Sequence, residues 1–186
     1  MPPLLLVLTG KTAAGKDTVM FQLLAKLPSL RRIITTTSRP MRENEENRVD
    51  YNFISESNFR QKIEKGEFIE YVEYGKNLYG TEKSQLTNNP NSNLIWRIDP
   101  SRAGQIRQLI KDSKVLVIYL TTPDEVVLER LKKRGLSEEE IKARMQDDKR
   151  FWEEFKNNYD FVVENIPGQL DQTVDKIVSI IEKSRS

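Results

Sequence analysis

An apolar run that leads straight into a glycine-containing loop constrains the fold more than any other feature of the chain. Residues 4–8 (LLLVL) are followed by residues 10–18 (GKTAAGKDT), and Val19, Leu23 and Leu27 then recur at helical spacing. A buried strand, a G-x4-G-K loop and a helix in this order form the Walker A arrangement, whose loop binds phosphate. The sequence therefore predicts a phosphate-binding loop at the end of a buried strand.

The residues of this loop have the chemistry that phosphate binding requires. Glycines let successive backbone N–H groups point towards one anion, and the N-terminus of the following helix adds partial positive charge. Lys16 would reach the β- and γ-phosphates of a nucleotide. An ordinary glycine turn with an exposed lysine is the alternative, and the flanking strand and helix argue against it. The expected nucleotide-binding residues of the loop are Gly10, Ala13, Ala14, Gly15, Lys16, Asp17 and Thr18.

Further apolar runs alternate with helix-period segments along the rest of the chain. Residues 33–36, 94–98, 115–120 and 161–163 are predicted to be buried strands, and residues 170–181 a helix. This alternation predicts βα units around a mostly parallel sheet, with five strands when residues 4–8 are counted. Residues 68–74 and 78–81 indicate a small antiparallel hairpin within a segment rich in charged and aromatic residues.

Two helix starts lie close together after the expected strand at residues 115–120. Thr122, Pro123 and Glu125 form one start signal, and Ser137 with Glu140 forms a capping box. Gly135 lies between them, where it would end the first helix. This pattern predicts a hinged helical hairpin, which we call the lid, over residues 128–157.

The residue types that are missing narrow the chemistry. The chain has no cysteine and no histidine, which excludes disulfides, zinc–sulfur sites and histidine-based triads. Its 30 basic and 28 acidic residues leave a formal charge of +2, so no overall field marks it as a nucleic-acid or membrane binder. No apolar run approaches the ~18 residues of a membrane span. We expect a soluble cytoplasmic protein, a monomer or homodimer, whose anion sites are local.

Residues 35–53 indicate a second anion site, because they combine hydroxyls, arginines and a tyrosine. Arg39 and Arg42 could present guanidinium groups to a monophosphate, and Tyr51 could add a phenolic donor. A solvated basic loop is the alternative, and composition alone would favour it.

Residues 37–53 resemble the guanylate kinase motif T-T-R-x-P-R-x-G-E-x-x-G-x-D-Y-x-F without gaps. Ser38, Met41 and Arg48 replace motif residues, whereas both arginines, the acid at Glu45 and the pair Asp50–Tyr51 match. The resemblance continues through residues 67–71 and 78–81 at the family's spacing. It covers nearly the whole chain, with core strands, acceptor insertion and lid in the family's order.

The resemblance implies an ATP-dependent kinase of GMP that uses Mg²⁺, with small-molecule substrates only. The acceptor phosphate would be held by Arg39, Arg42, Tyr51 and Tyr79. The guanine would be read by Thr35, Glu70, Thr81 and Asp99. Arg134 and Arg144 match the lid arginines, which with Lys16, Arg39 and Arg42 make the expected catalytic set, and Asn165 matches an adenine contact.

Two residues depart from the family pattern at positions that the family uses near Mg²⁺. Asp17 stands where a Ser or Thr supplies a hydroxyl to Mg²⁺, and Arg97 replaces the first aspartate of the family's D-x-D motif. One hypothesis is a coupled swap in which Asp17 and Arg97 form a salt bridge. The alternative is that Asp17 ligates Mg²⁺ while Arg97 touches phosphate.

The expected architecture is a P-loop NTPase fold of the α/β class with a small mixed α+β insertion and a helical lid. The core would comprise residues 1–37, 85–127 and 158–186, with the GMP-binding insertion at 38–84 and the lid at 128–157. Two rival functions remain open. One is a guanylate-kinase-like binding module that has lost catalysis, and the other is a kinase of another small phosphorylated acceptor.

Overall fold

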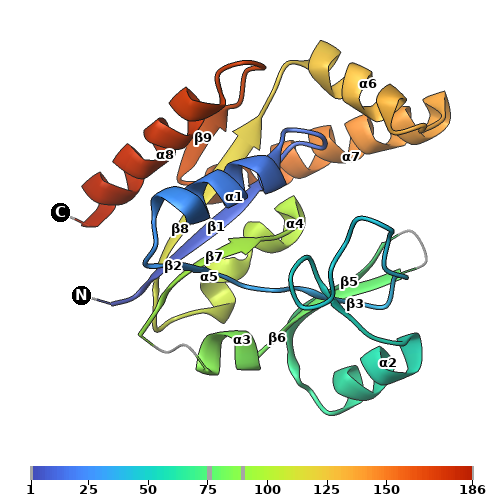
Figure 1. Cartoon of the computed structure of the whole chain (residues 1–186), viewed down its shortest axis with the longest axis vertical. Helices are drawn as coiled ribbons and strands as arrows, with labels where there is room; N and C mark the ends of the chain where they lie inside the picture. Colours follow the sequence, from blue (N-terminus) through green and yellow to red (C-terminus); the bar gives the residue numbers. More distant parts are fainter. Residues whose placement is uncertain (1, 75–76, 89–90, 186) are drawn as a thin grey trace. The chain divides into compact units, whose positions relative to one another are not determined.

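The computed structural model describes residues 2–74, 77–88 and 91–185 (Figure 1). The strands are β1 (Leu4–Gly10), β2 (Leu30–Arg32), β3 (Thr36–Thr37), β4 (Asn52–Phe53), β5 (Phe68–Tyr74), β6 (Asn77–Glu82), β7 (Asn93–Arg97), β8 (Lys114–Thr121) and β9 (Phe161–Glu164). The helices are α1 (Lys16–Lys26), α2 (Glu56–Glu64), α3 (Ser84–Thr87), α4 (Pro100–Ala103), α5 (Ile106–Leu109), α6 (Asp124–Lys133), α7 (Glu138–Phe155), the 3-10 turn η1 (Lys156–Asn158) and α8 (Leu170–Arg185).

The chain forms two compact units. The larger unit comprises Met1–Arg31 and Asn93–Ser186, and the smaller unit comprises Arg32–Ser92. The smaller unit includes the predicted insertion at residues 38–84 and extends beyond it at both ends. The predicted lid lies within the larger unit, and its behaviour as a separate moving part stays a prediction.

The larger unit is built on a five-stranded sheet in the order β2-β7-β1-β8-β9. β1 pairs in parallel with both β7 and β8, and β8 pairs in parallel with β9. β1 is buried along its whole length because it lies at the centre of the sheet and is apolar on both faces. α1 and α8 pack side by side over one face, where Val19, Leu23, Val174 and Ile177 join the core (Figure 1). The predicted α/β fold is confirmed.

The smaller unit has a four-stranded sheet in the order β4-β3-β6-β5. β5 and β6 form the predicted antiparallel hairpin, and β6 also pairs antiparallel with β3. α2 covers one face, where Phe59 stacks on Phe68 with ring centroids 4.4 Å apart. Gly80 lies under these rings, and a side chain there would overlap both of them. Because side chains alternate along a strand, Tyr79 and Thr81 lie on the opposite face of β6.

Two local predictions are wrong. Residues 33–36 do not form one strand, because β2 ends at Arg32 and β3 begins at Thr36 in the other sheet. Between them Ile34 donates its N–H to the side chain of Gln85, at 3.0 Å, and the apolar run connects a strand of one sheet to a strand of the other.

The helix start near residue 122 is also built differently. Thr122 does not cap α6, because its hydroxyl donates to the backbone oxygen of Asn165 at 2.9 Å, and the helix begins after Pro123 without a side-chain cap. The capping box of Ser137 and Glu140 at the start of α7 is present as predicted. Among the described residues, the helices are all too short or too polar to cross a bilayer.

Candidate functional site

The loop between β1 and α1 has the backbone geometry that the sequence indicates. Gly10 has φ 138°, and a side chain there would collide with the backbone of Leu120 on the neighbouring strand. Gly15 has φ 84° in the left-handed region and precedes the first turn of α1. Both positions therefore require glycine, and together they direct the loop into the helix N-terminus.

The side chain of Lys16 lies back along this loop. Its Nζ donates to the backbone oxygens of Gly10 and Lys11, each at 2.8 Å. Burial, helped by the positive charge of Arg97, lowers the pKa of Lys16 from 10.5 to about 8, although nearby carboxylates oppose the fall. An anion that reaches this ammonium would therefore relieve an electrostatic cost that the ligand-free loop carries.

Three side chains from distant parts of the chain hold the loop. Asn165 donates from Nδ2 to the oxygen of Ala14 at 2.8 Å, and Arg130 donates from Nη1 to the oxygen of Ala13 at 2.7 Å. A carboxylate oxygen of Asp148 accepts the N–H of Thr12 at 2.9 Å. Burial raises the pKa of Asp148 from 3.8 to about 6, although the Thr12 hydrogen bond opposes the rise.

Sequence reasoning found only one of these three side chains. Asn165 was expected at the adenine, whereas the structure shows it buried and bonded to the loop, so its adenine contact stays a prediction. Arg130 and Asp148 lie 117 and 136 residues from their loop partners. No local pattern marks a contact at that separation.

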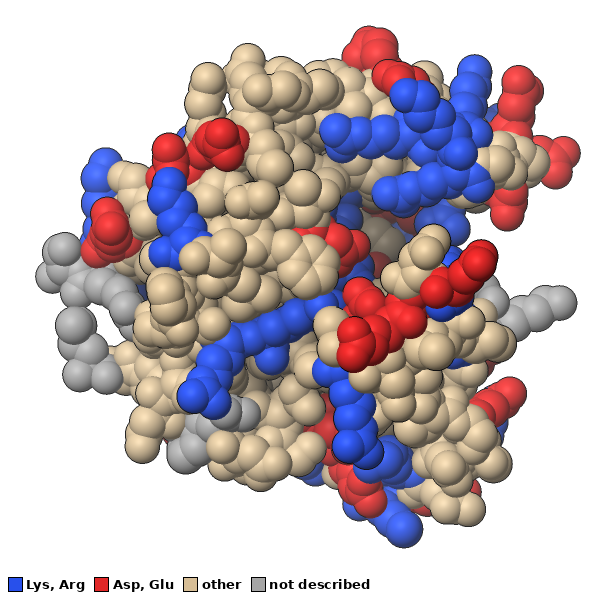
Figure 2. All heavy atoms as spheres, in the orientation of Figure 1, with Lys and Arg blue, Asp and Glu red and all other residues tan. Residues whose placement is uncertain are grey.

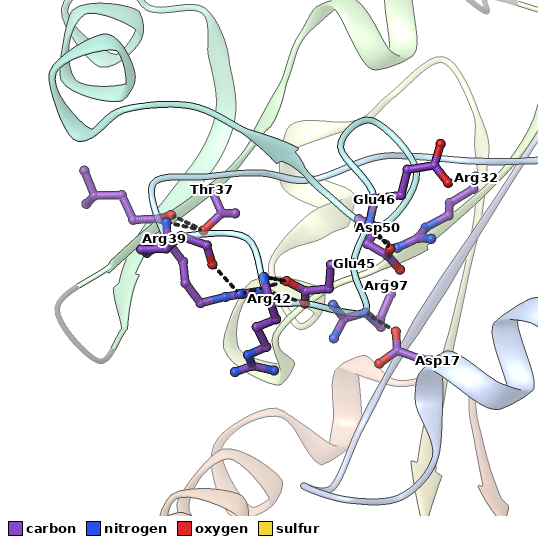
Figure 3. Close-up of polar contacts among 11 residues, drawn as sticks. Asp17, Arg32, Thr37, Arg39, Arg42, Glu45, Glu46, Asp50 and Arg97 are labelled. Atoms are coloured by element: carbon purple, nitrogen blue, oxygen red, sulfur yellow. Dashed lines mark hydrogen bonds and ion pairs between the residues drawn. The ribbon is translucent and has the colours of Figure 1, made fainter.

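Asp17 and Arg97 form an ion pair, as the coupled-swap hypothesis predicts. Nε of Arg97 lies 2.8 Å from Oδ1 of Asp17 (Figure 3). Asp17 is the second residue of α1, and Arg97 ends β7 opposite Leu8 of β1. The side chain of Arg97 is 25% exposed and that of Asp17 58% exposed. The pair thus places a guanidinium on the strand beside the phosphate loop.

The other predicted donor-side residues are also located. Ala13 and Ala14 are buried within the loop, and the side chain of Thr18 is exposed on α1. Asp99 caps α4, accepting the N–H of Ser101 at 2.9 Å and its hydroxyl at 2.6 Å. The guanine contact expected of Asp99 stays a prediction.

The α6–α7 hairpin carries the predicted lid arginines. Arg134 ends α6 with an exposed side chain, and Arg144 is half-buried on α7. Basic side chains gather over this part of the molecule (Figure 2). Ala13 of the loop packs with Val127, Leu131 and Ile141 of the hairpin, so loop and lid share a small core. A cavity of about 820 Å³ lies beside it, with Tyr119, Trp152 and Asp148 among its lining residues.

The smaller unit holds a preformed arginine fork. Arg39 donates from Nη1 and Nη2 to the two carboxylate oxygens of Glu45, at 2.9 and 2.7 Å (Figure 3). Hydrogen bonding to Arg39 holds the pKa of Glu45 below its usual value. The guanidinium carbon of Arg39 lies 5.5 Å from the ring centroid of Tyr51, whose ring meets that of Tyr79 edge-on at 6.2 Å. Three of the four predicted phosphate-binding residues are therefore neighbours.

The fourth residue, Arg42, is attached to the same carboxylate by its backbone. Its N–H donates to Oε2 of Glu45 at 2.9 Å, and its exposed side chain extends away from that contact (Figure 3). Glu45 therefore positions both arginines, although only Arg39 has its guanidinium held.

The predicted guanine-reading residues of the smaller unit share one face of its sheet. Glu70 on β5 stands directly opposite Thr81 on β6, and Tyr79 lies two residues before Thr81 on the same face. Thr81 is buried and Glu70 half-buried. The half-buried Thr35 precedes β3, and its backbone oxygen accepts the N–H of Asn52 at 2.9 Å. A carboxylate and a hydroxyl thus lie side by side, on the same face as Tyr79, which is one of the predicted phosphate-binding residues.

Oxygen ligands for a metal ion are sparse in the described part of the chain. No group of three or more His, Cys, Asp or Glu residues there could hold an ion. The carboxylate of Asp17, the predicted metal ligand, is paired with Arg97.

Comparison with known proteins gives a consistent result. The family model described as guanylate kinase matches residues 3–184. A guanylate kinase of Thermotoga maritima is 32% identical over 98% of this chain and 87% of its own length. One of Symbiobacterium thermophilum is 33% identical, with the same coverage of both chains. The crystal structure of guanylate kinase from Anaplasma phagocytophilum superposes with a TM-score of 0.76 at 22% identity, covering 98% of this chain and 86% of that one, which supports the fold.

Proposed function

The chain belongs to the guanylate kinase family, and we propose that its own residues carry out the family's reaction, the transfer of the γ-phosphoryl group of ATP to GMP. The observation that supports the proposal is that one chain contains two groups of residues suited to binding anions. One is the glycine loop with Lys16, and the other is the arginine fork beside the Glu70–Thr81 pair. ATP is the phosphoryl donor.

The donor site binds the triphosphate of ATP. Backbone N–H groups of the loop and of the N-terminus of α1 donate hydrogen bonds to the β-phosphate, and the helix N-terminus adds partial positive charge at the same point. On ATP binding, Lys16 exchanges the carbonyl oxygens of Gly10 and Lys11 for phosphate oxygens. Arg134 and Arg144 of the lid then neutralise charge on the transferred group and exclude water.

The acceptor site binds GMP by phosphate and base. Arg39, Arg42, Tyr51 and Tyr79 hold the monophosphate, because guanidinium and phenol groups are strong donors to its oxygens. Glu70 accepts the N1–H and N2–H donors of guanine, and Thr35, Thr81 and Asp99 complete the recognition of the base. AMP has no such paired donors, so it would leave the Glu70 carboxylate without partners.

The reaction needs alignment and charge neutralisation rather than a general base. An oxygen of the GMP phosphate forms a bond to the γ-phosphorus as the bond to the β–γ bridging oxygen breaks, and ADP leaves with that electron pair. The products are GDP and ADP. The absence of histidine from the chain agrees with this chemistry.

The setting of the reaction is part of the proposal. Mg²⁺ accompanies ATP and supplies further neutralisation of phosphate charge. We propose a cytoplasmic monomer or homodimer without nucleic-acid or membrane partners, in keeping with the absence of cysteine and the near balance of basic and acidic residues.

A coupled assay of ADP release with a panel of nucleoside monophosphates tests the function. GMP should be turned over, and AMP and dTMP should be slower by about a hundredfold or more. Glu70→Gln should reduce kcat/KM for GMP by about 10- to 100-fold without raising the activity towards dTMP. Equal turnover of AMP would contradict the assignment of guanine.

One observation favours a second function, a binding module without catalysis. The Asp17–Arg97 pair removes the usual oxygen ligands of a protein-bound metal. Isothermal titration followed by the coupled ADP assay distinguishes the two functions. A module would bind GMP and an ATP analogue in the titration, and yet it would release no ADP from ATP with any acceptor.

A further inference from the structure

Arg97 occupies a position from which a cation can act on the phosphates of ATP. It ends β7, and its neighbour across the sheet is Leu8, two residues before Gly10 begins the phosphate loop. Its partner Asp17 follows Lys16 directly in the chain. All of these residues belong to the larger unit, so their arrangement is a property of one compact body.

The donor set at this position does not fit a metal ion held by the protein. Mg²⁺ prefers hard oxygen ligands in an octahedral arrangement, which P-loop proteins supply from a Ser or Thr hydroxyl and a strand carboxylate. Here the strand position presents a guanidinium, and the carboxylate of Asp17 has that guanidinium 2.8 Å from its oxygen. Among the described residues, no group of three or more His, Cys, Asp or Glu residues could hold an ion. A divalent cation bound to Asp17 would be repelled by the adjacent positive charge of Arg97.

Arg97 and Lys16 lie close enough for their charges to interact. After burial, Arg97 is the largest cause of the lowered pKa of Lys16. Two cations that repel one another across a ligand-free site are both stabilised when an anion enters between them. The ligand of this site, a triphosphate, is such an anion.

We propose that Arg97 is a further catalytic residue, whose guanidinium contacts the ATP phosphates beside Lys16, and that Asp17 is a positioning residue that holds it there. The guanidinium takes over the charge neutralisation that a protein-bound metal would give. This inference rests on the proposed phosphotransferase function, because it assumes ATP at the loop.

The chemistry of a guanidinium suits this role. It keeps its charge at any working pH, and its planar fork of five N–H donors matches the geometry of phosphate oxygens. As the bond from the γ-phosphorus to the bridging oxygen breaks, negative charge grows on the oxygen of the leaving ADP. A cation aimed at that oxygen stabilises the transition state. Mg²⁺ bound with ATP would then take its ligands from the nucleotide and from water, and would need no carboxylate of the chain.

Binding of a non-hydrolysable ATP analogue, titrated with Mg²⁺ and again in EDTA, tests the proposal. The wild-type protein should bind the metal-free analogue within about tenfold of its affinity for the Mg²⁺ complex. Arg97→Ala should weaken metal-free binding about 10- to 100-fold, as expected for loss of a charged hydrogen-bonding group. The matched control Lys26→Ala removes a positive charge from the other end of α1, where it pairs with Asp175, and should bind like the wild type.

The double variant Asp17→Ser with Arg97→Asp gives the sharper result. It restores a hydroxyl and a strand carboxylate, so it should bind the analogue at least about tenfold more tightly with Mg²⁺ than without. Thermal unfolding verifies that each variant is folded, and Arg97→Gln replaces Arg97→Ala if the latter unfolds. Metal-free binding by Arg97→Ala or Arg97→Gln that equals the wild type would overturn the proposal, and so would a double variant with no greater response to Mg²⁺ than the wild type.

The two proposals can fail separately. Wild-type turnover of GMP with Mg²⁺ and ATP tests the proposed function alone. If the protein showed no turnover and its metal-free nucleotide binding still depended on Arg97, the proposed reaction would be wrong. Arg97 would then remain a nucleotide-binding residue.

Discussion

The two units position their cations in opposite ways. In the smaller unit Arg39 and its partner Glu45 are six residues apart, and the carboxylate grips both ends of the guanidinium. In the larger unit Arg97 and Asp17 are 80 residues apart (97 − 17), and the ion pair spans from strand to helix. Arg39 is thus held within one local segment, whereas Arg97 is held by the packing of the fold. Substitutions should therefore act locally in the smaller unit and spread through the loop contacts in the larger one.

The largest effect is expected at the donor side, from Lys16→Ala. Loss of the ammonium that we propose contacts the β- and γ-phosphates should lower kcat by about 10²- to 10³-fold. The free energy of unfolding should not fall, because burial makes the charged Lys16 costly in the ligand-free protein. The coupled ADP assay measures the first effect and thermal unfolding the second.

Two outcomes would count against this assignment of Lys16. Turnover that stays within a few-fold of the wild type would remove Lys16 from the reaction. A large fall in affinity for GMP, measured by titration without ATP, would show that the two units do not separate donor and acceptor functions. Lys26→Ala, with its charge lost from an exposed pair, should change neither quantity.

The acceptor side should respond next, and unequally at its two arginines. Arg39→Ala should raise the KM for GMP by about a hundredfold, because a positioned charged donor is lost. Arg42→Ala should raise it by about tenfold or less, since its side chain is exposed and must be ordered on binding. Steady-state kinetics with GMP as the varied substrate measure both.

The lysine variant distinguishes geometry from charge. Arg39→Lys keeps the charge and loses the fork that Glu45 grips at two atoms, so it should recover only a small part of the affinity. Equal effects of Arg39→Ala and Arg42→Ala would show that the preformed fork has no role in binding GMP.

The same contrast explains what the sequence could predict. The phosphate loop, the capping box at Ser137 and the hairpin β5–β6 are local patterns, and each is present in the structure. The paired placement of Glu70 and Thr81 follows from strand alternation once the hairpin is known. The Asp17–Arg97 pair was predicted because two unusual charges stand at two positions that converge in the family.

The rest depends on contacts that no local signal reports. Arg130 and Asp148 reach the loop only because the α6–α7 hairpin packs on Ala13. The run at residues 33–36 does not form one strand because it connects β2 of one sheet to β3 of the other, and apolar character does not distinguish a strand from such a connection. Thr122 has the residue type of a cap, yet its hydroxyl donates to Asn165 on the neighbouring segment.

A smaller effect, on stability, should come from Asp148→Asn. Because burial raises the pKa of Asp148 to about 6, its ionised form is disfavoured in the folded state. The cost is small below about pH 4, grows between about pH 4 and 6, and is complete at pH 7. The free energy of unfolding of the variant should therefore be about 1–2 kcal/mol larger than that of the wild type at pH 7. Thermal unfolding at the two pH values measures this difference.

The control for Asp148 is Asp147→Asn, the adjacent carboxylate, which pairs with Arg150 on the exposed side of α7. It should stabilise the protein less than Asp148→Asn does at pH 7, because Asp147 is only a minor cause of the raised pKa of Asp148. If Asp148→Asn were equally stabilising at pH 4 and pH 7, the ionisation of Asp148 would not be the cause.

The smallest expected effect is a shift in a pH profile, and it links the donor cations to one another. The kcat/KM for ATP reports the pKa values of the free enzyme. It should fall as pH rises above about 8, because Lys16 then loses the proton that it needs to bind phosphate. Arg97→Ala removes the positive charge that lowers this pKa, so the same fall should occur at a higher pH. Asp17→Asn should shift the fall to a lower pH, because a carboxylate that raises the pKa of Lys16 is lost.

A merely structural role of the Asp17–Arg97 pair would lower activity at every pH alike. Opposite shifts in the two variants would therefore identify Arg97, Asp17 and Lys16 as one electrostatic unit. An unchanged pH profile in both variants would show that the pair does not act on the charge of Lys16.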